Sequence, residues 1–134
     1  MEKIKKYLEE KKISYHLSEN EIIVPYEIDD KKFHISIQLF KKWVNARALI
    51  VKNIQVPPEK YADLMRELLI ANHDFPEINY DISREGDIFS SADMGVSIID
   101  YDNFFSEFYA IPFAIKRFIE KIAPKFDIEV TGFA

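Results

Sequence analysis

Residues 21–39 read EIIVPYEIDDKKFHISIQL, two alternating apolar runs that meet at the polar pair Asp29-Asp30. A period of two places successive side chains on opposite faces of a β-strand. Two such runs joined by a two-residue polar corner are typical of an antiparallel hairpin. The apolar face of this hairpin comprises Ile22, Val24, Tyr26, Ile28, Phe33, Ile35, Ile37 and Leu39.

A third β-rich run extends from Trp43 to Asn53 and has two possible inner faces. One consists of Val44, Ala46, Ala48 and Ile50, and the other of Trp43, Asn45, Arg47, Leu49 and Val51. We expect the first face in the core, because it carries no charge, whereas the second would bury Arg47 without an evident partner. Its small alanines would also let a helix pack close to the sheet.

Helical periodicity appears before and after these strands. The first dozen residues form a short amphipathic pattern, and Pro57-Pro58 suits the first turn of a second helix, where a missing N–H costs nothing. That helix ends at Asn72-His73-Asp74, because Phe75-Pro76 prevents its continuation. A segment of alternating apolar residues then precedes a turn at residues 84–87, and a less regularly patterned β-rich segment follows it. The glycine of this turn can take a positive φ.

The last helix is capped by Asp100 or Asp102. Its apolar stripe runs from Phe104 to Ile122, and Pro112 predicts a kink. The tail from Pro124 holds enough apolar residues for a short strand. The sequence therefore predicts one α+β domain over residues 1–134. Its antiparallel sheet carries helices on one face, in the order α-β-β-β-α-β-β-α.

This order resembles the type III secretion chaperone-like fold, and most of all the YbjN-type family described as bacterial sensory transduction regulators. The residues that carry the resemblance are Glu67-Leu68-Leu69-Ile70-Ala71-Asn72, Asn79-Tyr80-Asp81-Ile82, Gly86-Asp87-Ile88 and the long final helix from Phe104. They are patterns of apolar residues rather than signatures, and they span nearly the whole chain. The resemblance implies an α+β domain that acts by protein contact, often as a dimer, without catalysis.

Composition excludes several classes of function. The chain has no cysteine, which excludes disulfides and thiolate chemistry and fits a reducing compartment, so we expect a cytoplasmic protein. A net charge of −5 argues against a nucleic-acid partner, because such proteins usually carry a basic face. No apolar stretch approaches the ~20 residues that span a bilayer, and the amino end does not resemble a secretory signal. We therefore expect that the protein binds neither a membrane nor a nucleic acid and that it carries no cofactor.

Catalytic and metal-binding patterns are not found. The three histidines, His16, His34 and His73, are not spaced as metal ligands on one helix. Asp100-Tyr101-Asp102-Asn103 begins like a calcium loop but lacks its later glycine and glutamate. We therefore predict no catalytic, cofactor or metal residues. A small enzyme that uses scattered Asp, Glu and His side chains is the less favoured alternative.

Two apolar surfaces are candidates for protein contact. If Trp43 faces outward, a cluster of large side chains with Arg47 covers the outer sheet face, and such residues are enriched at the energetic centres of interfaces. This set comprises Ile23, Phe40, Trp43, Arg47, Leu49 and Val51. The carboxy-terminal tail could instead cover this face.

The second surface is a row on the last helix made of Phe105, Tyr109 and Phe113. The helix is then apolar on two adjacent sides and needs a cover beyond its own sheet, either the first helix or a partner. We accordingly predict a non-enzymatic, chaperone-like or regulatory interaction domain that forms a homodimer. The other alternative is a small-ligand domain whose apolar pocket is lined by Tyr26, Tyr80 and phenylalanines.

Overall fold

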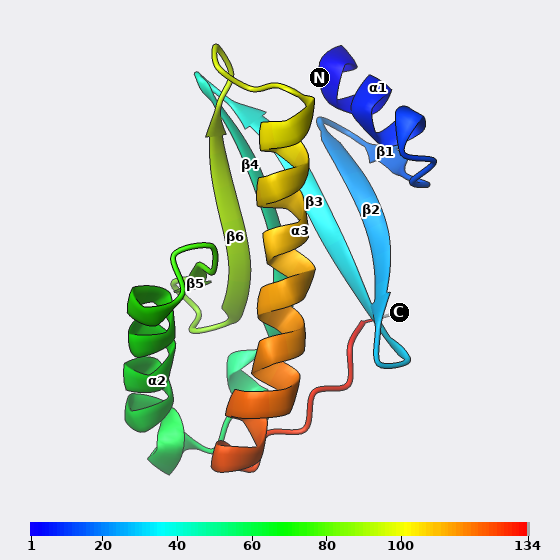
Figure 1. The fold of residues 1–134 in the computed structure, drawn as a ribbon. Coiled ribbons are helices and arrows are strands. Elements are labelled where there is room, and N and C mark those ends of the chain that lie inside the picture. The colour runs from blue at the N-terminus through cyan, green and yellow to red at the C-terminus, as the bar shows by residue number, and fades with distance from the viewer. Residues whose placement is uncertain (134) are drawn as a thin grey trace.

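The computed structural model describes residues 1–133, which form a six-stranded antiparallel sheet with helices over one face (Figure 1). The strands lie in the order β1-β2-β3-β4-β6-β5. Their bounds are His16–Ser18 (β1), Glu21–Ile28 (β2), Lys31–Phe40 (β3), Trp43–Val51 (β4), Tyr80–Ile82 (β5) and Ile88–Gly95 (β6). The helices are α1 (Glu2–Glu10), α2 (Tyr61–Asp74) and α3 (Tyr101–Arg117). The predicted α+β class and element order are confirmed, with the short strand β1 as an addition.

The predicted hairpin is β2–β3, in register from Glu21↔Gln38 to Ile28↔Lys31. Its corner residues Asp29 and Asp30 have φ values of 50° and 65°. Two successive positive φ values are those of a type I′ turn, whose twist matches that of the strands it joins. The turn is thus set by two aspartates, which tolerate the left-handed region better than most residues.

The inner face of β4 is the uncharged one, as predicted: Val44, Ala46, Ala48 and Ile50 are all buried. After α2, the chain returns as the β5–β6 hairpin, and β6 rather than β5 pairs with β4. The β5–β6 turn uses Gly86 at φ 85°, and the Tyr61 hydroxyl donates to the Gly86 carbonyl at 2.9 Å. This bond joins the start of α2 to the turn.

The side chain of Asn72, near the end of α2, both donates a hydrogen bond to the backbone of β5 and accepts one from it. Its side-chain amide donates to the Tyr80 carbonyl at 3.0 Å, and its oxygen accepts the Tyr80 backbone N–H at 2.8 Å. The side chain therefore occupies the place of a neighbouring strand, which fixes the first residue of the edge strand β5.

Helix α3 lies across the sheet and supplies much of the core (Figure 1). The Asp100 carboxylate caps it by accepting the Asn103 backbone N–H at 2.8 Å. The helix runs through Pro112 to Arg117 and continues in a single π turn, Phe118–Ile122. Its buried stripe comprises Phe104, Phe108, Ile111, Ile115, Phe118 and Ile122.

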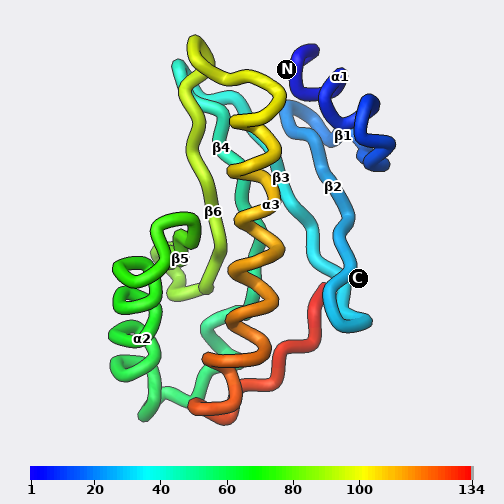
Figure 2. Tube along the Cα trace, in the orientation of Figure 1, coloured from blue at the N-terminus to red at the C-terminus, as the bar shows by residue number. Residues whose placement is uncertain are grey.

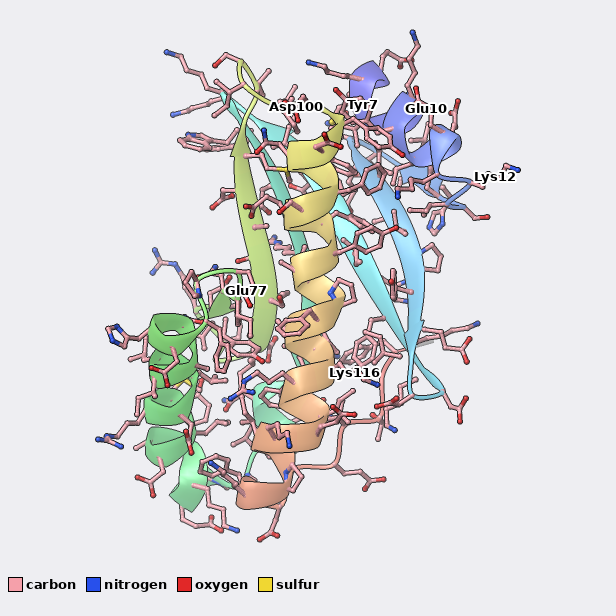
Figure 3. All side chains as sticks on the ribbon, in the orientation of Figure 1. Tyr7, Glu10, Lys12, Glu77, Asp100 and Lys116 are labelled. Carbon is pink, nitrogen blue, oxygen red and sulfur yellow. The ribbon has the colours of Figure 1, made fainter. Side chains whose placement is uncertain are left out.

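Helix α1 packs near the start of α3. Ile4 and Leu8 are buried, and the Tyr7 ring meets the Tyr101 ring edge-on at 5.5 Å. The Lys3 ammonium donates to the Ile99 carbonyl at 2.9 Å. Figure 3 shows Tyr7 on α1 facing the amino end of α3, next to the capping residue Asp100. Within residues 1–133, no helix combines the length and hydropathy needed to cross a membrane.

The carboxy-terminal tail does not form the strand that its apolar residues predict. Residues 123–126 make a 3₁₀ turn, and the following described residues are irregular. The tail returns to the turn end of the β2–β3 hairpin (Figure 2), where the Phe133 N–H donates to the Lys32 carbonyl at 2.6 Å. Phe126, Ile128 and Val130 are buried, so the tail closes the core without joining the sheet.

Candidate protein-interaction surface

The face of the sheet opposite the helices is largely polar. The Glu21 carboxylate accepts hydrogen bonds from the Ser36 hydroxyl and, at 2.8 Å, from the Gln38 amide. These bonds, followed by the nearby Arg47 charge, hold the pKa of Glu21 below its ordinary value, because they favour the ionised form. The Asn45 amide similarly donates to the Asp93 carboxylate at 2.8 Å. Most of this face is therefore satisfied by its own network.

One end of the outer face is apolar instead. Phe40 and Trp43 flank the two-residue β3–β4 turn and are 64% and 53% exposed. They line a groove of about 420 Å³ together with Gln38, Asn45, Arg47 and Asp93. The groove thus has aromatic side chains, one cation and one carboxylate on its walls.

Arg47 lies at the groove with its guanidinium 5.4 Å from the centre of the Phe89 ring. A cation at this distance over an aromatic ring is attracted by the ring's negative face. Within residues 1–133, no carboxylate forms an ion pair with Arg47. Arg47 is therefore an exposed cation beside an aromatic ring.

Ile98 extends the apolar end, although sequence analysis missed it. It is 75% exposed, and its Cγ1 lies 3.3 Å from where a Cβ on Gly95 would be. Gly95 pairs with Trp43 across β4 and β6, so Ile98 sits beside Trp43. Ile98 and Phe89 gave no signal in the sequence: the first is in a loop, and the second belongs to a strand whose pattern is weak.

The sheet-face prediction is partly corrected by the structure. Phe40, Trp43 and Arg47 come together at one groove, while Ile23 and Leu49 are half-buried and lie outside it. Val51 is fully buried, so the expectation that it faces outward is wrong. The β4–β6 register shifts between Leu49 and Val51, which breaks the alternation and turns both Ile50 and Val51 inward. The tail, which packs on the core side, leaves the groove open.

On the last helix, the first of the two covers that the sequence left open, the first helix, accounts for Phe105, so Phe105 is not an exposed interface residue. Phe105 is only 6% exposed, because it packs on Tyr101 and Phe104 and lies under the Lys11 ammonium of the α1 end, 5.3 Å from its ring centre. Helix α1 is thus part of the cover for this row. Tyr109 and Phe113 remain 38% and 50% exposed.

Tyr109 and Phe113 line a smaller groove of about 350 Å³ with Tyr26 and Lys116. Lys116 projects from α3 near the β2–β3 turn (Figure 3), and its ammonium lies 3.2 Å from the Asp29 carboxylate. This ion pair fixes one wall of the groove. This groove is what remains of the second apolar surface predicted from the sequence, because Tyr109 and Phe113 are exposed and Phe105 is buried.

The two tyrosines of the small-ligand alternative pack into different parts of the core. Tyr80 is buried against Phe118, and its hydroxyl donates to the Ala114 carbonyl at 2.5 Å. Burial raises the pKa of Tyr80, so this hydroxyl stays protonated. Tyr26 packs edge-on against Phe108 instead.

The histidines of the enzyme alternative also lie apart. His16 and His73 are exposed, and His34 is half-buried on the outer face. Among the residues that the structure describes, no group of three His, Asp or Glu side chains could hold a metal ion.

Comparison with known proteins agrees with this architecture. No protein-family model and no curated protein sequence matches the chain. Among solved structures, YbjN of E. coli, described as a transcription regulator, has a TM-score of 0.67 at 15% identity over 95% of this chain and 93% of that chain.

Two further structures are complexes. A chain of the ExsC–ExsE complex has a TM-score of 0.63 at 12% identity over 90% of this chain and 94% of its own. A chain of the heterodimeric ExoU–SpcU complex, from the type III secretion system of Pseudomonas aeruginosa, has a TM-score of 0.65 at 12% identity over 92% and 98%. The chain therefore has the type III secretion chaperone-like fold, of the YbjN type.

Proposed function

We propose that this protein is a non-enzymatic interaction domain that binds another protein through the apolar end of its outer sheet face. The observation that carries the proposal is the joint exposure of Phe40 and Trp43 at a groove that also presents Arg47. Large aromatic side chains and arginine contribute most to the binding energy of interfaces. Leaving two such rings in water is unfavourable, and a partner that buries them removes that cost.

The structural neighbours support this proposal. Two of them were solved as complexes, ExsC with ExsE and ExoU with SpcU. Because fold alone does not determine function, the groove carries the argument and the neighbours add to it. We further propose that the protein works in the cytoplasm, a reducing compartment that suits a chain without cysteine.

We also propose that the protein forms a homodimer. A twofold dimer can bury the same apolar patch of both chains at once. Two patches are available, the groove at Trp43 and the smaller groove at Tyr109 and Phe113. We favour the Trp43 groove, because its two aromatic side chains are the more exposed of the two pairs. A second copy and another partner protein would then compete for this groove.

Affinity purification from native cells tests the interaction. Wild type, Trp43→Ala and Leu69→Ala are used as bait, and bound proteins are compared by quantitative mass spectrometry. Leu69 is a matched control, because it is 69% exposed but lies on α2, away from the groove. A protein that binds wild type and Leu69→Ala and is lost with Trp43→Ala is the expected result. Equal capture by all three baits would refute the proposal.

A further inference from the structure

A pocket of about 210 Å³ lies between the end of α2 and the turns that continue α3. Figure 1 shows these two parts of the chain beside each other at the lower end of the molecule. The pocket shares no residue with either groove described above. Its walls carry three cations, those of Arg117, Lys121 and Lys125. They also carry two carboxylates, those of Glu67 and Asp74.

Part of the charge in this pocket is not neutralised by the protein itself. The Lys125 ammonium lies 2.7 Å from the Glu67 carboxylate, so this pair cancels its own charge. Arg117, Lys121 and Asp74 form no ion pair with any residue in 1–133. Two unpaired cations against one unpaired carboxylate leave one positive charge in excess, in a chain whose net charge is −5. The pocket therefore favours a ligand with a single negative charge.

Arg117 is the cation that lacks an acceptor. Its guanidinium carbon lies 4.1 Å from the centre of the Phe75 ring, so the ring shields one side of the cation from water. The Nε atom is buried, and no residue that the structure describes accepts a hydrogen bond from it. The other N–H groups of the guanidinium donate to no residue in 1–133 either. A charged group that loses water without gaining an acceptor is costly, and an anion in the pocket would reduce this cost.

The π turn after α3 is a second, independent indication of a site. The Ala123 N–H donates to the Phe118 carbonyl, five residues earlier, in place of the four-residue spacing of an α-helix. Such turns are rare and are frequently found at functional sites. This one carries Lys121 and Ile122 into the wall of the pocket that Arg117 also lines.

The rest of the lining indicates what the anion carries. Ile70, Ala71 and Ile122 present aliphatic side chains. At half the volume of the Trp43 groove, the pocket has space for a small molecule rather than for a chain segment. A carboxylate is planar, brings one negative charge and accepts from two N–H groups of a guanidinium at once. Inorganic phosphate carries more charge at neutral pH and has no apolar part, so it fits less well.

We propose that this pocket binds a small free monocarboxylic acid with a short aliphatic group. The carboxylate pairs with Arg117 and Lys121, and the aliphatic group contacts the aliphatic side chains of α2 and of the π turn. A bound acid would join the end of α2 to the end of α3, because its two parts contact different elements. The pocket is distinct from the Trp43 groove, so this inference goes beyond the proposed function and does not depend on it.

The probe is 4-methylpentanoate, titrated to about 10 mM at constant pH and ionic strength, a range that detects weak binding. The amide resonances of Ala71, Lys121 and Ile122 report the complex. Three other ligands are the controls on wild-type protein. 4-Methylpentanamide has the same shape without the charge, and inorganic phosphate has charge without the aliphatic group. N-acetyl-leucine presents the same side chain and carboxylate as the end of a protein chain would.

We expect saturable binding of 4-methylpentanoate and weaker binding of all three controls, by about tenfold for the amide. Arg117→Gln removes the guanidinium and takes no hydrogen bond from the fold, because Arg117 donates none within residues 1–133. It should weaken binding of the acid about tenfold, and Lys121→Gln about threefold. Lys6→Gln is the matched control and should bind like wild type, because it makes the same change of charge at an exposed position on α1.

Circular dichroism confirms folding of the variants, and the amide gives an answer on unmodified protein even if Arg117→Gln unfolds. Four results would overturn the inference. They are no saturable binding of the acid, binding of the amide or of phosphate as tight as that of the acid, tighter binding of N-acetyl-leucine than of the acid, and an equal effect of Arg117→Gln and Lys6→Gln. The last result would make the acid an adventitious ion only. Capture of a partner at the Trp43 groove is measured with other variants, so neither experiment decides the other.

Discussion

At the scale of single residues, Glu21 links the outer face to pH. Hydrogen bonds from Ser36 and Gln38 lower the pKa of Glu21 below its ordinary value of 4.5. A carboxylate with a lowered pKa stabilises the fold above its ordinary pKa, and this contribution is lost as pH falls through the folded-state pKa. Thermal unfolding between about pH 6 and pH 3 should therefore depend less on pH in Glu21→Gln than in wild type. Glu10→Gln, at an exposed position on α1, should keep the wild-type dependence.

Asn72 is the residue whose loss we expect to destabilise the α2–β5 junction. Its side chain makes two hydrogen bonds to the Tyr80 backbone. Each bond contributes about 1 kcal/mol, and its removal leaves part-buried backbone groups unpaired. Asn72→Ala should lower the free energy of unfolding in urea by ~2 kcal/mol. Asn103→Ala, exposed on α3, serves as the control, and an equal loss there would contradict this role.

At the scale of elements, the tail depends on a glycine. Gly132 has φ 75°, and a Cβ there would lie 2.7 Å from the Lys32 carbonyl oxygen. Gly132→Ala should therefore push the tail off β3 and cost about 1–3 kcal/mol, since it combines a steric clash with backbone strain. Hydrogen exchange at Phe133 should accelerate. Thr131→Ala, at an exposed neighbouring position, should leave both quantities near wild type.

Elements with a strong local period could be predicted from the sequence, and those that depend on distant contacts could not. The β2–β3 hairpin and the inner face of β4 follow from alternation, which each strand carries by itself. The burial of Val51 needs the β4–β6 register shift, and that of Phe105 needs the docking of α1. Strand β1 has three exposed residues and no periodic signal.

At the scale of the whole molecule, self-association can be assigned to one of two surfaces. Truncating a central aromatic anchor costs ~2 kcal/mol or more of association. Sedimentation at tens of micromolar should show a wild-type dimer that Trp43→Ala dissociates. A wild-type monomer under these conditions would contradict the dimer. If Phe113→Ala alone dissociates it, the α3 groove is the interface.

The candidate site was predictable only in part at this scale. Phe40, Trp43 and Arg47 lie close along the chain, on either side of one tight turn, so a local pattern sufficed to group them. Ile98 joins them only because β6 pairs with β4 after α2 and β5 have intervened.

The same strand order has a kinetic consequence. The β2–β3–β4 meander closes through two tight turns, whereas the Trp43↔Gly95 pairing must wait for a long loop to close. Loop closure costs entropy before the contacts repay it, so the meander is expected to form early and β6 late. In stopped-flow experiments, Ile35→Val should mainly slow folding, and Ala92→Gly should mainly speed unfolding. Until β6 pairs with it, β4 is an unpaired edge strand of the partly folded sheet.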